Sequence, residues 1–321
     1  MSAPGGPLHG FDAAATIDRL ASETVEAVRG LGRRGAVVAT SGGIDSSAAA
    51  GICVRALGAD KVQLLRLPER DVGDSSSDLA LELAESLGAD SVEEPITAAL
   101  EGLGCYAQRD EAIRAVFPDY EPSWKHKLVR SAPSASITVF SLVVERPDGS
   151  REQRRMPADA YLTLLAATNM KQRVRKLREY TWADRLSYAV IGTPNLLEYD
   201  QGFFVKGGDG LADIKPIAGL YKGQVYAVAR ELGLPDTIVS RAPTTETFSL
   251  PQTQEEFYFG HSYERMDALM WGHLHDVDPA DLVAEVGLSV EEIEAAYAEI
   301  ERRRTATAYL HAPAVLFARE A

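Results

Sequence analysis

The sequence predicts an α/β protein in which helices cover both faces of a parallel β-sheet. Segments rich in β-branched residues alternate with segments of helical composition as far as Arg241. Such alternation is typical of parallel sheets, whose strands are joined by helices. In addition, the strand "AVVAT" ends at a Ser-Gly-Gly turn that leads into an Ala-rich helical segment. Ligands of these sheets bind at the carboxyl ends of the strands, so we expect the functional site there.

The N-terminal part of the chain predicts a helix, a strand and then a second strand followed by a helix. Apolar residues between Asp12 and Leu31 recur at helical spacing and predict an amphipathic helix before the first strand. The second strand, "VQLLRLP", is expected to begin at Val62. The next helix, in "SSSDLALELAESLGAD", begins with residues that favour helix N-caps and is expected to end at Gly88.

The later part of the chain predicts one more buried strand and then only helices. The strand is "LSYAVIGT", residues 186–193, and the helix in "YKGQVYAVARELGLP" should end at Gly233 and Pro235. Beyond it we expect a Pro/Thr-rich loop and helices such as "SVEEIEAAYAEIERRR". We interpret residues 241–321 as a helical part of one domain that spans residues 1–321.

One segment, residues 118–168, interrupts the alternation and is interpreted as an insertion. At its centre, Ser136–Pro157 combine a β-branched run, a Pro-Asp-Gly turn and a return segment, which predicts a β-hairpin. The run is apolar on both strand faces, so the hairpin should pack against the protein. One face carries Ile137, Val139 and Val143, and the other carries Phe140, Leu142 and Val144.

Composition favours a small-molecule substrate and disfavours a nucleic acid. The 321 residues carry a net charge of −14, whereas nucleic-acid binding needs clustered Lys and Arg residues. The sequence has no apolar run long enough to span a membrane and its start does not resemble a signal peptide, so we expect a cytoplasmic protein. Cys53 and Cys105 lack metal-ligand spacing and are expected to be reduced and structural.

The turn "SGGIDSS" predicts a cradle for a magnesium-bound polyphosphate. An anion at the end of the strand would meet the N–H groups of Ser41, Gly42 and Gly43 and the positive end of the helix that follows. Ser46 adds a hydroxyl donor, and Asp45 would repel a phosphate unless a divalent cation bridged them. The Walker A, dinucleotide and nucleophile-elbow patterns are absent. A plain glycine turn with an incidental aspartate is the alternative.

Several motifs together resemble one enzyme family. "SGGIDSS" resembles the pyrophosphate loop of the N-type ATP pyrophosphatases, and the other motifs stand in the order found in the NAD synthetases. The resemblance covers about residues 15–300 outside the insertion. The motifs are "RLP" at Arg66–Pro68, "NMKQRVR" at Asn169–Arg175, "GTPNLLE" at Gly192–Glu198, "FFVKGGDGLAD" at Phe203–Asp213, "GLYKGQV" at Gly219–Val225 and "PTTE" at Pro243–Glu246.

The resemblance implies an adenine nucleotide alpha hydrolase-like fold and an ATP-dependent ligase. Such an enzyme transfers AMP from ATP to a carboxylate, here expected to be that of deamido-NAD, and ammonia then displaces AMP to form an amide. The chain is too short for an added amidase domain, so it should use free ammonia or ammonia from a separate donor. The resemblance also implies a homodimer. Two alternatives are a relative that adenylates another carboxylate and a PP-loop enzyme that modifies RNA.

The resemblance also assigns candidate site residues. ATP and Mg²⁺ are the expected cofactors, and Asp45 and Lys222 are the expected catalytic residues. Taken alone, Glu198 could be a helix-start acid or could complete the oxygen ligands that Asp45 begins. The expected contacts are Ser41, Gly42, Gly43, Asp45, Ser46, Arg66, Thr193, Lys222 and Thr244 for ATP, Asp45 and Glu198 for the metal, and Arg173, Lys206 and Asp213 for the dinucleotide.

Three features depart from the family pattern or lie outside it. The C-terminal His-Lys pair is missing, and His311 or Arg304 could replace it. Glu246 and Gln254 stand where aspartates are usual. The insertion, we hypothesise, covers or narrows the carboxylate side of the site.

In "NMKQRVRKLREY" most of the five cations are expected to be surface charges because they cannot all share one helix face. These cations are Lys171, Arg173, Arg175, Lys176 and Arg178.

Overall fold

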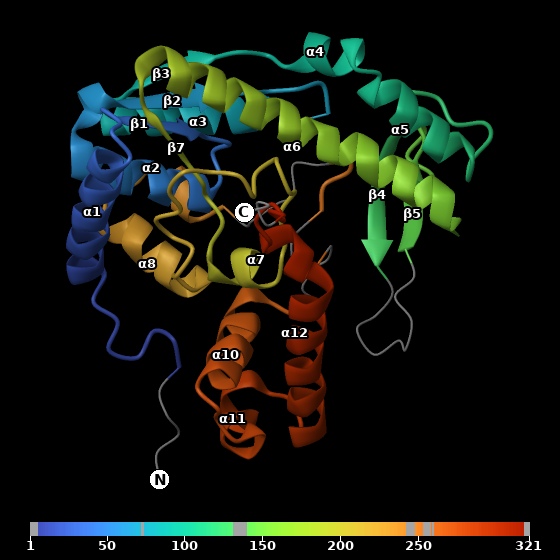
Figure 1. The fold of residues 1–321 in the computed structure, drawn as a ribbon. Coiled ribbons are helices and arrows are strands. Elements are labelled where there is room, and N and C mark those ends of the chain that lie inside the picture. Colours follow the sequence, from blue (N-terminus) through green and yellow to red (C-terminus); the bar gives the residue numbers. More distant parts are fainter. Residues whose placement is uncertain are drawn as a thin grey trace.

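The main sheet has four parallel strands in the order β3-β2-β1-β7 (Figure 1). The computed structural model describes residues 6–71, 74–130, 140–241, 248–252, 258 and 260–317, without the side chains of residues 74–76. The α/β fold class is confirmed. The strands are β1 (Ala36–Ala39), β2 (Val62–Arg66), β3 (Asp90–Glu93) and β7 (Ala189–Ile191).

Helices cover both faces of this sheet because successive strand side chains point to opposite sides. Val38 and Leu64 pack into one apolar layer, and Val37 and Leu65 pack into the other. The first layer contains α1 (Ala13–Gly30), α2 (Ile44–Leu57), α3 (Asp74–Leu87), α8 (Lys222–Glu231) and α9 (Asp236–Val239). The second contains α4 (Thr97–Gly102), α5 (Cys105–Arg114) and part of α6 (Ala158–Leu186).

Several local signals in the sequence are confirmed. Asp12 caps α1 and accepts a hydrogen bond from Ala15 N at 3.0 Å. Gly88, with φ of 62°, directly follows α3, where a left-handed conformation favours glycine. Cys53 and Cys105 are free and buried, as expected. A short 3-10 helix, Ala59–Lys61, joins α2 to β2.

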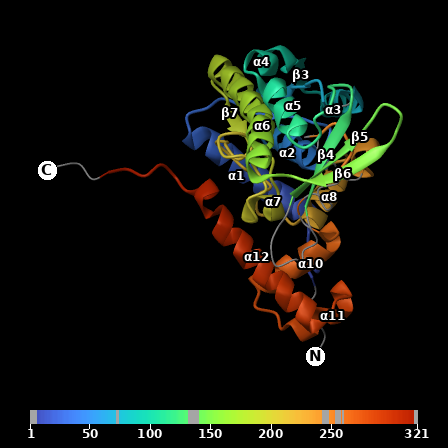
Figure 2. The ribbon, with the colours of Figure 1, turned by 90° about the vertical axis from the view of Figure 1, so that its right-hand side faces the viewer.

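A second, antiparallel sheet of three strands lies beside the first (Figure 2). The predicted hairpin is confirmed as β5 (Phe140–Glu145) and β6 (Arg151–Arg155), whereas β4 (Lys125–Arg130) was not predicted. Leu142 and Val144 are fully buried in an apolar cluster with residues of α5, β4 and α6. The hairpin therefore packs as expected. Ile137 and Val139 lie outside the described residues.

Helix α6 joins the two sheets. Its first residues pack in the cluster under the small sheet, and Val174 and Ala183 pack against the main sheet. The helix begins at Ala158, so the last part of the segment interpreted as an insertion is the first part of the helix that carries Arg173. A change in the small sheet is thus connected to Arg173 through one continuous element.

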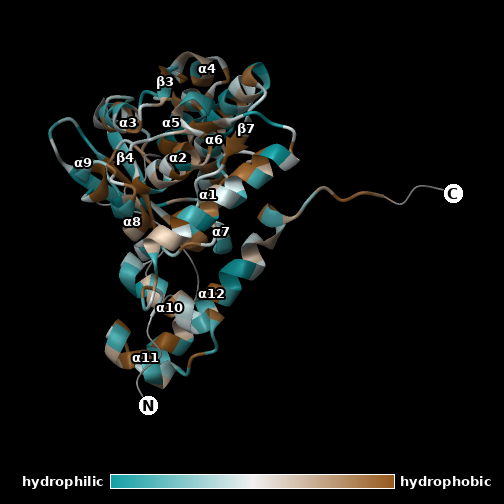
Figure 3. Ribbon diagram, turned by 90° about the vertical axis from the view of Figure 1, so that its left-hand side faces the viewer, coloured by the Kyte–Doolittle hydropathy of each residue, from teal (hydrophilic) through white to brown (hydrophobic). Residues whose placement is uncertain are grey.

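The C-terminal helices form a separate apolar cluster below the main sheet (Figure 2). They are α10 (Tyr263–Leu274), α11 (Pro279–Val286) and α12 (Val290–His311), and Leu197 of α7 (Leu196–Asp200) joins the same cluster. After α12 the chain extends away from the body, and Figure 3 shows a largely hydrophobic stretch there. Among the described residues, no helix is long and apolar enough to cross a membrane.

Candidate active site

Two of the predicted site segments lie where β1 and β7 end. These strands are neighbours, and β1 also pairs with β2 on its other side, so the chain order reverses at this point of the sheet. Ligands of open α/β sheets bind at such a reversal, outside the carboxyl ends of the strands. The Ser-Gly-Gly turn follows β1, and the segment that ends at Glu198 follows β7.

The turn after β1 is held by its own hydroxyl groups. Gly42 has φ of 75°, a conformation that residues with a Cβ rarely adopt. The Ser46 hydroxyl donates to the Gly43 carbonyl at 3.0 Å. The N–H groups of Ser41 and Gly43 donate to the Ser46 and Ser41 hydroxyls at 3.3 Å. These two bonds are long for N–H donors, so an anion at the N-terminus of α2 could replace them.

Asp45, Lys222, Asn195 and Glu198 form a buried charged group beside the turn. Lys222, at the first position of α8, forms an ion pair with one carboxylate oxygen of Asp45. The other oxygen of Asp45 accepts a hydrogen bond from the Asn195 amide at 3.0 Å. Asn195 also caps α7, and Glu198 completes that capping box through the Asn195 N–H at 3.1 Å. One asparagine therefore links both carboxylates.

The charges in this group raise the pKa values of both Glu198 and Lys222. Burial, and then the negative charge of Asp45, raise the pKa of Glu198 to about 8. Burial alone would lower the pKa of Lys222, but the charges of Asp45 and Glu198 outweigh it and raise that pKa. Lys222 therefore stays protonated, while Glu198 needs further positive charge to ionise at neutral pH. A divalent cation would supply that charge.

The donor set suits Mg²⁺. In proteins Mg²⁺ is usually held by one or two carboxylates together with substrate phosphates. Asp45 and Glu198 are two carboxylates of this kind, next to a turn with anion-binding geometry. Within the described residues, no group of three or more His, Cys, Asp or Glu side chains could hold a metal by itself. The residues therefore fit a metal that is completed by a phosphate ligand.

Asp267 is a functional candidate that the sequence analysis missed. Its buried carboxylate, on α10, accepts hydrogen bonds from the N–H groups of Lys222 at 3.1 Å and Gly223 at 2.7 Å. Burial raises the pKa of Asp267 to about 6, although these bonds act in the opposite direction. The Tyr263 ring lies 4.7 Å from the Lys222 ammonium. No local pattern marks Asp267, because its partners are far away in the sequence.

Of the other expected ATP contacts, the structure describes Arg66 and Thr193. Arg66 ends β2 and contacts the Glu93 carboxylate at 2.5 Å and the Ser91 hydroxyl at 3.1 Å. Thr193 is partly exposed in the segment between β7 and α7. Thr244, like Glu246 and Gln254, lies outside the described residues.

Two of the expected dinucleotide contacts lie together, and the third has a different setting. Arg173 donates to the Lys206 carbonyl at 3.3 Å. The Lys206 ammonium donates to the carbonyls of Tyr309 at 2.6 Å and Ala312 at 3.0 Å, at the end of α12. Asp213 lies at the edge of β7, where its carboxylate accepts from Val190 N at 2.8 Å.

The two candidates for the missing His-Lys pair differ in their surroundings. Arg304 is held in a bidentate ion pair with Asp200 at 2.7 and 2.9 Å. His311 lies edge-on to the rings of Tyr199 and Phe204, with ring centroids 4.9 and 5.0 Å away. Because Lys206 contacts the same end of α12, His311 is the candidate nearer to the expected dinucleotide contacts.

The expectation that most cations of α6 are surface charges is wrong. Lys171 and Lys176 are buried, and Arg173 alone of the five is exposed. Lys176 pairs with Glu179 at 2.6 Å, and Lys171 pairs with Glu69 at 2.9 Å. The spacing of the cations along the helix did not reveal that Lys171 is buried, because the acid that pairs with Lys171 comes from the segment after β2.

A sequence model of the NAD synthase family matches residues 16–115 and 137–309. The chain belongs to the NAD synthase family. It is 48% identical over 303 residues to an NH(3)-dependent NAD(+) synthetase of Rhizobium meliloti, covering 94% of this chain and 91% of the relative. It is 34% identical over 253 residues to the protein of that name from Thermotoga maritima, covering 79% and 85% of the two chains.

Solved structures support the NAD synthase fold. The NMN synthetase of Francisella tularensis matches with a TM-score of 0.66 at 23% identity, covering 95% of this chain and 98% of that one. The NH3-dependent NAD synthetase of Campylobacter jejuni matches with a TM-score of 0.62 at 20% identity, covering 96% and 100%. The family match leaves out residues 116–136, which include β4 and overlap the first part of the segment interpreted as an insertion, residues 118–168.

Proposed function

We propose that this chain is an ammonia-dependent NAD synthetase that adenylates the carboxylate of deamido-NAD and aminates it. Members of the NAD synthase family form a carbon–nitrogen bond and use ATP as a substrate, and relatives 48% and 34% identical carry the ammonia-dependent name. The observation that carries the proposal is the buried group of Asp45, Lys222 and Glu198 at the reversal between β1 and β7.

ATP would bind with its phosphates at the N-terminus of α2. The N–H groups of Ser41, Gly42 and Gly43 and the hydroxyl of Ser46 would donate to phosphate oxygens, and the helix end favours negative charge there. Lys222 would add a fixed positive charge. Further contacts would come from Arg66, Thr193 and Thr244. Asp45 and Glu198 would hold magnesium, which supplies positive charge beside the phosphates when bound.

The reaction needs two displacements and no covalent nucleophile from the protein. In the first, an oxygen of the substrate carboxylate bonds to the α phosphorus of ATP, and the bond to pyrophosphate breaks. In the second, ammonia bonds to the acyl carbon, AMP leaves with the bonding electrons, and the nitrogen loses a proton. Lys222, kept protonated by Asp45 and Glu198, stabilises the negative charge that develops on the departing pyrophosphate.

The dinucleotide would bind near Arg173, Lys206 and Asp213. Lys206 would exchange its bonds to the end of α12 for bonds to an anionic substrate group. Asp213 already binds the edge of β7, so its expected role requires a shared or rearranged hydrogen bond. We propose that His311 takes the place of the missing His-Lys pair.

We also propose a homodimer that uses ammonia from solution or from a separate donor. The outer face of α6 exposes Leu162 and Leu177, on the same helix as Arg173. These two exposed leucines fit a contact with a second copy of the chain, which would bring the partner close to the dinucleotide contacts. Light scattering measures the mass directly, and a fully active monomer would contradict the dimer.

The decisive experiment is incubation of the purified protein with ATP, Mg²⁺, ammonium and deamido-NAD. Mass spectrometry should show NAD, AMP and pyrophosphate in equal amounts. Omitting ammonium should stop NAD formation, and replacing it with glutamine should not restore it. ADP and orthophosphate as products would refute the proposed chemistry, and adenylation of a different carboxylate in place of deamido-NAD would refute the proposed substrate.

A further inference from the structure

The loop that carries Lys206 is held against α12 at three places. At the start of the loop, Asp200 pairs with Arg304 of α12 at 2.7 Å. Gly202, with φ of 68°, lies so close to the helix that a Cβ in its place would be 2.3 Å from the Cβ of Thr307. At the end of the loop, Lys206 donates to two main-chain carbonyls at the end of α12. The position of α12 therefore determines where the loop lies.

Tyr258 links this loop to α12 as well. Its hydroxyl donates to the Gln201 carbonyl at 2.7 Å, and its ring stacks on the Phe203 ring, with centroids 4.5 Å apart. The guanidinium of Arg303, a buried residue of α12, lies over the same Tyr258 ring at 4.9 Å. Displacing Tyr258 would therefore disturb both the loop and its contact with the helix.

Arg130, the last residue of β4, binds both Tyr258 and α12. Its guanidinium donates to the Tyr258 carbonyl at 3.2 Å and to the Glu299 carboxylate of α12 at 2.7 Å. Glu299 also accepts from Arg303 at 3.0 Å. Burial alone would raise the pKa of Glu299, but the hydrogen bond from Arg130 and the charge of Arg303 outweigh it and lower that pKa. Glu299 is therefore ionised at neutral pH, and its bond to Arg130 belongs to the strong, charge-assisted kind.

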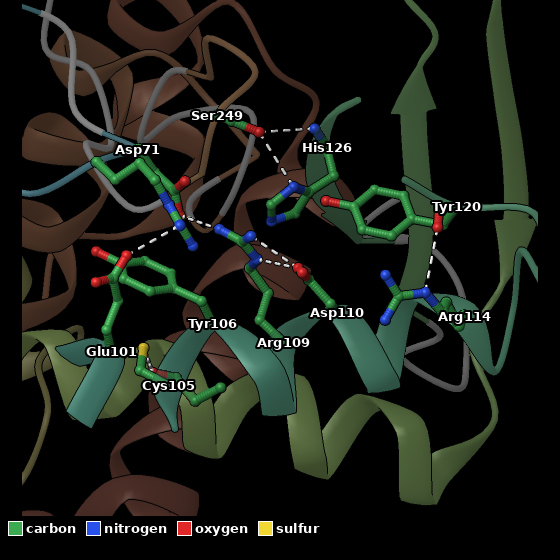
Figure 4. Close-up of polar contacts among 12 residues, drawn as sticks. Asp71, Glu101, Cys105, Tyr106, Arg109, Asp110, Arg114, Tyr120, His126 and Ser249 are labelled. Carbon is green, nitrogen blue, oxygen red and sulfur yellow. Dashed lines mark hydrogen bonds and ion pairs between the residues drawn. The ribbon is translucent and has the colours of Figure 1, made fainter. Parts of the chain in front are cut away.

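Strand β4 is itself anchored, so Arg130 is held on a fixed support. The strand pairs with β5 along its whole length, from Lys125 to Arg130. Near its start, His126 N donates to the Ser249 hydroxyl at 2.9 Å, and the His126 ring Nδ1 lies 3.1 Å from the same hydroxyl (Figure 4). The strand belongs to residues 116–136, which the family model does not match. Arg130 is therefore a support for α12 and Tyr258 that the family model does not include.

We propose that Arg130 is a positioning residue for the dinucleotide substrate and acts through Tyr258 and α12. The proposal rests on the proposed function, which assigns Lys206 to the dinucleotide. Lys206 can exchange its bonds to α12 for bonds to the substrate only if its backbone stays where the substrate binds. Arg130 holds the loop in that place, because it binds both the helix and the tyrosine that contact the loop. Part of the segment interpreted as an insertion thereby acts on the carboxylate side of the site.

The test compares the binding of two ligands to Arg130→Met. Calorimetry measures the dissociation constants of deamido-NAD and of Mg-ATP separately, without turnover. Loss of the guanidinium should weaken the binding of deamido-NAD about threefold to tenfold, as expected for a network residue that does not touch the ligand. The binding of Mg-ATP should change less than about twofold. Tyr258→Phe removes only the hydroxyl that binds the Gln201 carbonyl and should act in the same direction.

Two further variants separate positioning from general damage. Arg146→Met removes another partly buried arginine of the small sheet, which pairs with Glu152 at 3.1 Å, and should change the binding of neither ligand. In Lys206→Met protein, the added Arg130→Met change should weaken deamido-NAD less than about twofold, because the group that Arg130 positions is already absent.

Unchanged affinity for deamido-NAD in Arg130→Met would overturn the proposal, as would equal weakening of both ligands. The same fold loss from Arg130→Met with and without Lys206 would also overturn it, because Arg130 would then act on another contact. Should Arg130→Met not fold, Tyr258→Phe decides between the same outcomes. Wild-type protein that binds deamido-NAD but makes no NAD would refute the proposed function, while the comparison of affinities would still decide the role of Arg130.

Discussion

Replacing Lys171 with methionine should destabilise the protein far more than the same change at Arg173, although both residues belong to α6. The side chain of Lys171 is 4% exposed and donates to Glu69 at 2.9 Å and to Asp71 at 2.7 Å. Arg173 is exposed and donates to the Lys206 carbonyl at 3.3 Å. Methionine keeps an unbranched apolar chain and removes the charge at either position.

The expected loss of stability comes from the two carboxylates that lose the Lys171 ammonium as a partner. Asp71 keeps its ion pair with Arg109, but Glu69, whose side chain is fully buried, loses the ammonium that it contacts. Removing one partner of a buried pair costs about 3–5 kcal/mol. The unfolding entropy of a 321-residue chain is about 0.7 kcal/mol/K, so Tm should fall by about 4–7 °C. For the exposed Arg173 the change should be below about 0.5 kcal/mol.

Urea unfolding and thermal unfolding of Lys171→Met and Arg173→Met would measure this difference. The KM for deamido-NAD provides a second readout. Arg173→Met should raise that KM at unchanged stability, because Arg173 is an expected dinucleotide contact. The reasoning would be refuted if Lys171→Met stayed within about 1 kcal/mol of the wild type, or if Arg173→Met lost as much stability.

Three further predictions concern the buried group at the site. Asp45→Ala and Glu198→Ala should each reduce AMP formation at least a hundredfold at saturating Mg²⁺ while circular dichroism stays unchanged, and near-normal turnover would exclude the residue as a metal ligand. In metal-free protein, stability from protonated Glu198 is complete below pH 4.5 and is lost as pH rises towards about 8, since burial raises its pKa. Tm should therefore fall between about pH 4.5 and 8 and stay level above that range, and Glu198→Gln should flatten the fall. Asp267→Ala should lower kcat at least tenfold, because the N–H groups of Lys222 and Gly223 lose the acceptor that fixes the start of α8. A kcat equal to that of the wild type would show that Lys222 does not need this support.

The sequence predicts elements whose signals are local. The strand, turn and helix from Ala36 to Leu57 follow from β-branched residues, a glycine that needs a positive φ and an Ala-rich segment. Strand β4 has no such signal, since "HKLVR" is short and its partner β5 follows only after a further stretch of chain. The burial of Lys171 and the role of Asp267 depend on acids and N–H groups from other elements, which helical spacing cannot reveal.

Glu198 shows why a local reading can leave two alternatives open. The sequence allowed a helix-start acid or a magnesium ligand. In the structure Glu198 is the third residue of α7 and completes its capping box, and the same carboxylate is buried close enough to Asp45 for that charge to raise its pKa. The helix-start position is therefore observed, and the metal role remains a prediction for the variants above.

Helix α6 fixes the orientation of the small sheet relative to the main sheet. It runs for 29 residues without interruption, a length of about 43 Å at 1.5 Å per residue. Inserting or deleting one residue near its middle would rotate one end by about 100° relative to the other and would move Lys171 and Arg173 away from their partners. Insertions and deletions among related proteins should therefore occur in the β5–β6 turn and not in the helix. The small sheet can then differ in size among these proteins, but its orientation relative to the main sheet stays the same.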